Sequence, residues 1–228
     1  MSPRSITLCA LLALLSISSH AGMTPEEVRT FGIYKKYAKQ GLAEAQFYLG
    51  FRYLTGSGVE KDEVLALSWF RKAAEQGHAQ GQFFLAACYA DGLGTAKDKI
   101  EAMKWCRKAA EQGSAPGQTL LGLNYLSGSG VAKDDVIAVS WFRRAAEQGY
   151  APGQNGLAEC YINGAGVPRD STEAYAWLNL AAATDKQLQD NLVVLEKKLS
   201  SYEIEAGQKR SKELKALIEK NKSAAGTK

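Results

Sequence analysis

Tryptophan recurs at a single interval in this chain, every 36 residues, at Trp69, Trp105, Trp141 and Trp177. The interval divides the sequence into four units, which are residues 43–78, 79–114, 115–150 and 151–186. The first and third units carry the same residue at 23 of their 36 positions, and the fourth is divergent. Self-similarity at a period of about 20–50 residues is typical of repeat architectures, in which each unit is one supersecondary element. The period therefore constrains the fold before any single motif does.

Each unit is predicted to be a helical hairpin, which the first unit illustrates. Residues 43–55 place the residues that recur between units at the i, i+3, i+4, i+7 spacing of one helical face. Gly56 can end this helix in the left-handed conformation, and Asp62 can cap a second helix over residues 62–76. A single hairpin cannot bury its apolar face, so the units are expected to stack into an all-α solenoid of antiparallel hairpins.

The tryptophans and two acidic caps refine this prediction. We expect all four tryptophans in the core, since a Trp side chain can bury roughly 150–250 Å². In two units the start of the second helix has the pattern of a reciprocal capping box, Asp98 with Glu101 and Asp170 with Glu173. In such a box each residue's side chain accepts a hydrogen bond from the backbone of the other.

Both ends of the repeat array are predicted to be capped by helices. Thr24 and Glu27 form a capping box with a proline between them, which predicts an N-terminal capping helix within residues 22–42. After the fourth unit the repeat is lost. The elements expected there are C-terminal capping helices over residues 187–220 and a flexible polar tail over residues 221–228.

Residues 1–21 have the pattern of a secretory signal peptide. Arg4 supplies the positive charge, and residues 6–17 form a short apolar stretch. This stretch is shorter than the roughly 20 apolar residues that a membrane-spanning helix needs. We therefore expect cleavage at Ala21 or Gly22 and a periplasmic or secreted protein with no integral membrane segment. The alternative is an uncleaved membrane anchor.

The recurring residues resemble the Sel-one-like repeat (SLR) family, a 36-residue relative of the tetratricopeptide repeat. The resemblance covers about residues 34–186. In the first unit, and at the equivalent positions of the next two, it is carried by Leu49, Gly50, Tyr53, Gly56, Gly58, Val59, Asp62, Ala66, Trp69, Ala73, Ala74 and Gly77. The resemblance implies a right-handed superhelical solenoid that acts as an adaptor between proteins. It also implies export, because bacterial members are often exported and some serve in host interaction or envelope assembly.

In related helical-hairpin solenoids, positions 2, 5, 9 and 13 of the first helix of each unit line the concave surface. Here these positions vary within an otherwise strict repeat, which indicates that the fold does not dictate them. We therefore expect this surface to bind a protein or peptide through Glu44, Phe47, Phe51, Gln80, Phe83, Ala87, Thr119, Leu123, Asn155, Glu159 and Asn163. Its phenylalanines and Leu123 would form an apolar stretch, and its asparagines and Glu159 a polar one. The alternative is that the phenylalanines pack beneath the N-terminal helix.

Motifs for catalysis or cofactor binding are missing from the sequence. The Gly-x-Gly loops of the four units lack the third glycine and the preceding strand of a dinucleotide fingerprint, so they are interpreted as helix-ending turns. With two histidines in all, neither a metal site nor a His-based triad is expected, and His78 is interpreted as a variable surface position. Neither S-x-x-K nor G-x-S-x-G occurs.

Two functions remain as hypotheses. The first is a non-enzymatic exported adaptor without a cofactor. The second is a cell-envelope enzyme acting on β-lactams or peptidoglycan, because some cysteine-rich relatives in the family that the chain resembles are described as penicillin-binding or weakly β-lactam-hydrolysing. The adaptor is the preferred interpretation, since the sequence offers no activated serine.

Three cysteines follow the predicted leader, and they are Cys88, Cys106 and Cys160. Three cysteines cannot all pair within one chain, so at least one free thiol is expected. A Cys88–Cys106 disulfide is left open.

The charge of the chain is modest. A net charge of +4 is too small to indicate nucleic-acid binding. Residues 207–228 hold seven Lys or Arg against two Glu, and this modestly basic segment fits either an exposed helix face or contact with an anionic envelope polymer or membrane surface. We expect a monomer whose partner is a protein or a peptide.

Overall fold

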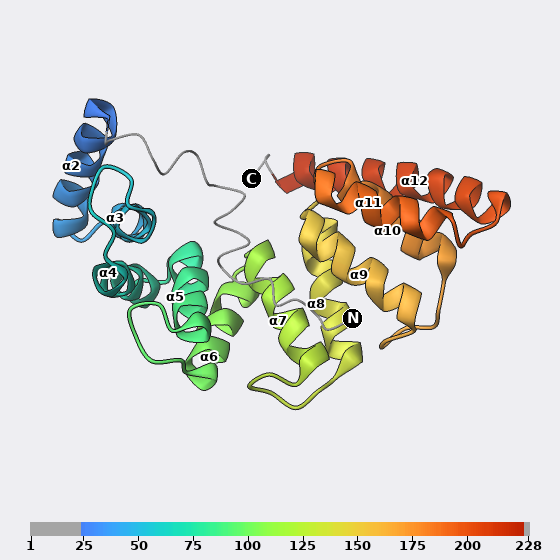
Figure 1. Cartoon of the computed structure of the whole chain (residues 1–228), viewed down its shortest axis with the longest axis horizontal. Coiled ribbons are helices and arrows are strands. Elements are labelled where there is room, and N and C mark those ends of the chain that lie inside the picture. Colours follow the sequence, from blue (N-terminus) through green and yellow to red (C-terminus); the bar gives the residue numbers. More distant parts are fainter. Residues whose placement is uncertain (1–23, 226–228) are drawn as a thin grey trace. The chain divides into compact units, whose positions relative to one another are not determined.

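The computed structural model describes residues 24–225, and this part of the chain is all-helical (Figure 1). Eleven helices, α2 to α12, follow one another within the described residues. The chain divides into two compact units, of which the first ends at Gln112 and the second begins at Gly113. The predicted signal peptide, residues 1–21, lies outside the described residues.

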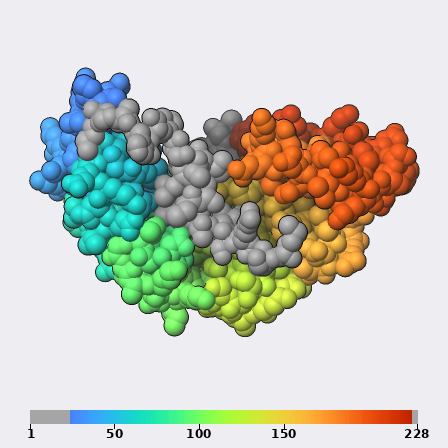
Figure 2. All heavy atoms as spheres, in the orientation of Figure 1, coloured from blue at the N-terminus to red at the C-terminus, as the bar shows by residue number. Residues whose placement is uncertain are grey.

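The first unit consists of a capping helix and two hairpins. Its helices are α2 (Pro25–Lys39), α3 (Ala43–Thr55), α4 (Glu63–Glu75), α5 (Ala79–Asp91) and α6 (Lys99–Glu111). We call the first helix of each repeat helix A and the second helix B. Helix A packs on helix B of its own repeat and on the helix that precedes it, so α3 contacts both α4 and α2. In Figure 2 the blue atoms of α2 continue into the cyan atoms of the first repeat.

The second unit consists of two hairpins and two capping helices. Its helices are α7 (Ala115–Ser127), α8 (Asp135–Glu147), α9 (Ala151–Asn163), α10 (Ser171–Ala182), α11 (Lys186–Glu196) and α12 (Ser201–Ala225). Here α7 packs on α8, α8 on α9, and α9 on α10, while α11 and α12 both cover α10. Sequential hairpin contacts of this kind confirm the predicted solenoid-like, all-α fold. The right-handed sense that the resemblance implies stays a prediction.

The two glycines of each loop have separate structural roles. Gly56 ends α3 in the left-handed conformation, with φ of 75°. Gly58 also has a positive φ, of 74°, and a Cβ atom there would collide with the backbone oxygen of Glu27 at the start of α2. The equivalent glycine of the second repeat, Gly94, lies against the backbone oxygen of Glu63 in the same way. The loops are therefore helix-ending turns, as predicted, and the second glycine lies against the start of an earlier helix, which the sequence did not indicate.

A buried glutamine in helix A links each repeat to its neighbour. In the first unit, Gln46 Nε2 donates to the backbone oxygen of Ala38, 3.3 Å away, at the end of the preceding helix. The side chain of Gln76, at the end of α4, donates to Gln46 Oε1 at 2.7 Å. Gln82 makes the same two contacts one repeat later, with the backbone oxygen of Ala74 and the side chain of Gln112. These bonds satisfy polar groups that would otherwise be costly to bury, so they explain why a polar residue recurs on a packing face.

The prediction that all four tryptophans lie in the core is correct for two of them. Trp105 and Trp177 are 9% and 4% exposed, whereas Trp69 and Trp141 are only half-buried. A cation lies over the ring in the first three repeats, and Lys72 Nζ lies 4.1 Å from the ring centroid of Trp69. The position is therefore partly a surface position, at which a long basic side chain shields the indole.

The two predicted capping boxes form only by half. Asp98 caps α6 as expected, but the Glu101 side chain accepts from Trp105 Nε1 at 3.0 Å instead of closing the box. Glu173 likewise accepts from Trp177 Nε1, at 3.1 Å. The reason is that an indole N–H buried one turn later competes for the same carboxylate. The sequence rule did not take account of this i,i+4 neighbour.

The two ends of the described chain agree with the predicted capping helices, with one difference in length. Thr24 and Glu27 form the full reciprocal box at the start of α2. At the other end, α12 continues to Ala225, so the expected flexible tail from residue 221 is helical over its first five residues. No helix within residues 24–225 has the length and apolar character needed to cross a membrane.

Candidate protein-binding surface

The structure divides the predicted binding residues into three groups by exposure. Those on the surface are Glu44, Gln80, Glu159 and Asn163. Those half-buried are Phe51, Leu123 and Asn155. Those buried, for which a surface position was the wrong prediction, are Phe47, Phe83, Ala87 and Thr119. Position 5 of helix A is thus a packing position in the first three repeats, and its variation reflects how each repeat fills its core.

Phe47 shows what buries this position. Its ring stacks on His78 at a centroid distance of 5.1 Å and contacts Phe70 at 6.0 Å and Phe84 at 5.4 Å. These ring partners all come after α3 in the chain, and none belongs to the N-terminal helix. The ring contacts of α2 with α3 go to Tyr48 and Tyr53. The aromatic contacts of Phe47 therefore do not support the alternative considered from the sequence.

Five phenylalanines of the first unit form one aromatic cluster, and they are Phe47, Phe51, Phe70, Phe83 and Phe84. Phe70 is fully buried at its base, with the backbone of Gly50 close to its ring. Phe51 and Phe84 are half-buried and meet edge to face, with ring centroids 5.7 Å apart. The cluster thus reaches the surface through one ring of α3 and one of α5.

Phe84 is a surface-reaching residue that the sequence analysis missed. It occupies position 6 of helix A, where the other repeats carry Tyr48, Leu120 and Gly156. This position varies as much as the four that were singled out, and that variation was the available signal. It lay outside the set of positions taken over from related solenoids.

His78 is half-buried and has a structural role that its variable position did not reveal. Its Nδ1 accepts a hydrogen bond from the backbone N–H of Gly81 at 3.1 Å, so the imidazole caps the N-terminus of α5. Burial against Phe47 lowers the pKa of His78 below its ordinary value of 6.5, and the negative charge of Glu44 opposes this shift. The neutral imidazole is the form that can accept the bond.

The helix A surface of the second unit is polar where that of the first is aromatic. Asn155 Nδ2 donates to Glu159 Oε1 at 2.9 Å along the exposed side of α9. Leu123 of α7 is the half-buried apolar residue among the predicted positions in this unit. A polar stretch in the fourth repeat is what the sequence predicted.

The cysteines lie in the core. Cys88, Cys106 and Cys160 are buried, and the disulfide left open between the first two is not formed. Burial raises the pKa of each thiol to about 12, so none has the thiolate character of a nucleophile or metal ligand. Within residues 24–225, His, Cys, Asp and Glu side chains do not gather in a group of three or more that could hold a metal ion.

Comparison with known proteins identifies the repeat. The family model described as "Sel1 repeat" matches residues 43–78, 79–114, 115–150 and 151–183. These are the four 36-residue repeats predicted from the sequence, with the last one three residues shorter. Among solved structures, a Sel1 repeat protein from Oxalobacter formigenes is 39% identical, with a TM-score of 0.64 over 69% of this chain and 65% of that one.

Two further structures are similar. A protective antigen present in uropathogenic Escherichia coli, which displays an SLR fold, is 32% identical, with a TM-score of 0.55 over 82% of this chain and 48% of that one. An immunity protein from Pseudomonas aeruginosa is 22% identical, with a TM-score of 0.54 over 96% of this chain and 83% of that one, which shows the fold alone. The chain thus spans about two thirds of the Oxalobacter protein and half of the antigen. No curated protein matches.

Proposed function

This chain belongs to the Sel1 repeat family, and on that premise we propose that it is an exported, non-enzymatic adaptor that binds a protein or peptide on the helix A surface of its repeats. The proposal includes cleavage of the leader after residue 21 or 22 and a periplasmic or secreted location. It includes a monomeric state and a role in envelope assembly or host interaction. Helical repeat scaffolds support such a role because they present extended surfaces for other proteins.

The observation that carries the proposal is the aromatic cluster of the first unit. Phe51 and Phe84 bring two adjoining rings to the surface, with three more phenylalanines holding them from beneath. Glu44 and Gln80 lie exposed one or two turns earlier on the same helix faces. Interfaces typically combine a few well-packed aromatic anchors with a polar rim, and the anchors supply most of the binding energy. This part of the surface therefore suits a partner that inserts apolar side chains.

The experiment replaces Phe51 by Glu and compares capture of partners by crosslinking in the native envelope. We expect the partner captured by the wild-type protein to be lost with Phe51→Glu and retained with Phe51→Leu. Val64 offers a matched control, because it is 63% exposed on helix B of the same repeat, and Val64→Glu introduces the same charge on another face. Retention of the partner by Phe51→Glu, or equal loss with Val64→Glu, would place the binding surface elsewhere.

The enzymatic alternative predicts turnover. An adaptor is expected to leave the β-lactam nitrocefin and a muropeptide preparation unchanged at micromolar protein. Hydrolysis of either above the rate of a heat-denatured sample would favour the envelope enzyme and overturn the non-enzymatic part of the proposal.

A further inference from the structure

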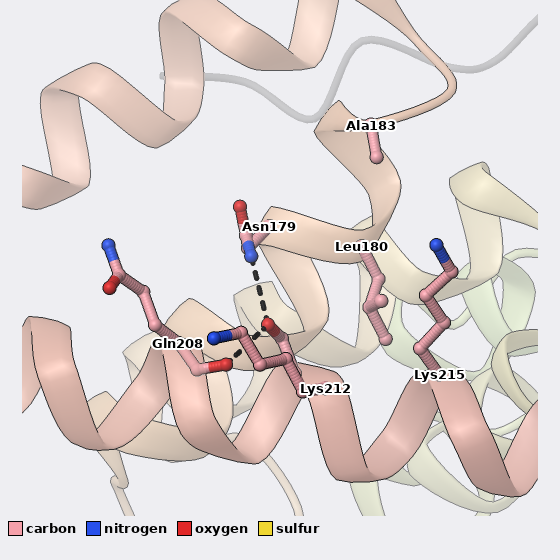
Figure 3. A pocket seen from close by; sticks show the side chains of 7 residues that line it. Asn179, Leu180, Ala183, Gln208, Lys212 and Lys215 are labelled. Atoms are coloured by element: carbon pink, nitrogen blue, oxygen red, sulfur yellow. Dashed lines mark hydrogen bonds between the residues drawn. The ribbon is translucent and has the colours of Figure 1, made fainter.

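A pocket lies between α10, the last helix of the repeats, and the C-terminal capping helix α12, which forms one of its walls. Its volume is about 360 Å³, and the lining residues used below are Asn179, Leu180, Ala183, Ser211, Lys212 and Lys215 (Figure 3). We propose that it binds the C-terminal carboxylate of a peptide whose last residue is apolar. The site is separate from the aromatic cluster, since every residue that lines it belongs to the second unit.

The positive charge of the pocket comes from Lys212 and Lys215, which lie three residues apart on one face of α12. Both are exposed, and neither forms an ion pair with a carboxylate within residues 24–225. Arg210 on the same helix behaves differently, because Glu173 and Glu213 hold it at 2.6 Å and 3.2 Å. In Figure 3 the ammonium group of Lys212 is seen on the Gln208 side of Asn179, and that of Lys215 is seen beyond Leu180. Because lysine has a flexible four-carbon stem, each ammonium group can turn to supply a charge-assisted donor to a carboxylate beside Asn179.

Asn179 supplies a hydrogen-bond acceptor in a settled orientation. Its Nδ2 donates to Ser211 Oγ at 2.9 Å, and the buried Ser211 hydroxyl donates in turn to the backbone oxygen of Gln208 at 3.0 Å. The amide nitrogen of Asn179 is thus engaged with α12, and Figure 3 shows its oxygen on the opposite side. A carbonyl oxygen placed in this way can accept the N–H of a peptide's last residue.

Leu180 and Ala183 give the pocket an apolar portion beside these polar groups. In Figure 3 the side chain of Leu180 points from α10 toward α12 and lies next to that of Lys215, so an apolar surface and a positive charge adjoin. A C-terminal residue presents the matching set, which is a carboxylate, an N–H and a side chain on one carbon atom. An apolar side chain would bury its surface on Leu180, at a gain of roughly 25 cal/mol for each Å².

The place of the pocket in the fold disfavours a doubly charged phosphate more than a singly charged carboxylate. Asn179, Leu180 and Ala183 lie at the C-terminal end of α10, where backbone carbonyls carry partial negative charge. Phosphate sites in proteins typically use backbone N–H groups at a helix N-terminus, which this end of α10 lacks. A singly charged carboxylate with an N–H beside it suits a wall of acceptors better than a dianion does.

The test uses two probes, the peptide N-acetyl-Ala-Ala-Leu with a free carboxylate and its C-terminal amide, titrated into the purified protein and followed by the NMR signals of its backbone amides. We expect the free acid to shift the signals of Asn179, Leu180 and Ser211 at millimolar concentration. We expect the amide to bind at least tenfold more weakly. The Lys212→Ala/Lys215→Ala protein should lose binding at least tenfold, and Lys212→Arg/Lys215→Arg should keep it.

Lys197 and Lys198, which are exposed beside α11, provide the matched control. Lys197→Ala/Lys198→Ala removes the same charge and should leave binding unchanged, with thermal melts confirming that every variant is folded. Absence of shifts with the free acid, or equal binding of the amide, contradicts the proposal. So does inorganic phosphate binding more tightly than the peptide, or phosphatidylglycerol vesicles binding through the two α12 lysines while the peptide does not. The site is independent of the proposed helix A surface, so Phe51→Glu should bind the peptide normally.

Discussion

The helices A of the first unit carry phenylalanine at positions where those of the second unit carry threonine, asparagine, leucine, glutamate or glycine. The scaffold beneath is the same in both units, with buried glutamines that bridge repeats and glycines that end each helix A. Two core phenylalanines show how the difference is absorbed. Phe70 packs against Phe84 at 5.2 Å, whereas the equivalent Phe142 lies against Gly156, where no side chain is present.

A position that varies between repeats is not necessarily exposed to solvent. Phe47 and Thr119 occupy the same repeat position and are both buried, although their side chains differ in size and polarity. Each repeat fills its core with whatever its neighbours leave room for, so a buried position can vary when a facing position varies with it. The positions that differ in exposure as well, such as Phe51 and Glu159, are the ones that distinguish the two surfaces.

The same charge is expected to have very different effects at a buried and at a surface-reaching phenylalanine. Phe83 is 5% exposed, so Phe83→Glu buries a carboxylate without a partner and should destabilise the first unit by more than ~3 kcal/mol. Phe51→Glu should cost far less, because its side chain can turn toward water. Chemical denaturation followed by circular dichroism measures both. Equal losses would mean that Phe51 is as much a core residue as Phe83.

The tryptophans give a second comparison, between a buried ring of the first unit and a half-buried ring of the second. Trp105→Ala should destabilise the protein by roughly 3–5 kcal/mol, the usual range for a buried large aromatic side chain. Trp141→Ala in the second unit should cost about half as much, because its ring is half-buried beneath Arg144 and loses less apolar contact. Thermal melts of the two variants, run side by side, test the order. A melt of Trp105→Ala within a degree or two of wild type would contradict a core position.

Most of the fold could be predicted from the sequence, because repetition shows the same local rules several times. The helix from residue 43 to 55 and its glycine cap are found as predicted, as is the capping box of Thr24. The partners of individual side chains could not be predicted in this way. Glu101 turns to an indole instead of its own helix cap, and Phe47 finds partners on two later helices. Such contacts depend on how neighbouring repeats pack, and the 36-residue spacing of the sequence does not encode that packing.

The pocket on α12 was beyond the reach of the repeat pattern for a related reason. Lys212 and Lys215 were visible only as part of a basic segment, and nothing in the sequence placed them beside Asn179. The candidate binding surface was predictable in part. Its exposed members on helix A were identified, whereas its second surface aromatic, Phe84, was not.

Thiol reactivity should be the same in both units, although the surfaces differ. Cys88 and Cys106 lie in the first unit and Cys160 in the second, and all three are buried thiols with a pKa of about 12. In the native protein at pH 8 we expect each to react with a thiol reagent far more slowly than an exposed cysteine does. In denaturant without a reducing agent, all three should titrate. A count of one would show a disulfide and would contradict the unbridged state of Cys88 and Cys106.

The smallest effect is expected from His78. Its imidazole caps α5 in the first unit, whereas the hydroxyl of Ser114 caps α7 in the second. Burial lowers the pKa of His78 in the folded protein below its ordinary value of 6.5, which the unfolded chain retains. Between these two values the unfolded state binds more protons than the folded state, so stability rises with pH. The contribution of His78 should therefore be complete above about pH 6.5 and should diminish as the pH falls through the folded pKa. His78→Asn keeps a capping side chain that does not titrate. The melting temperatures of the two proteins are compared from pH 5 to pH 8. The increase of melting temperature with pH should be smaller in the variant than in the wild type. Identical increases would mean that the pKa of His78 does not change on folding.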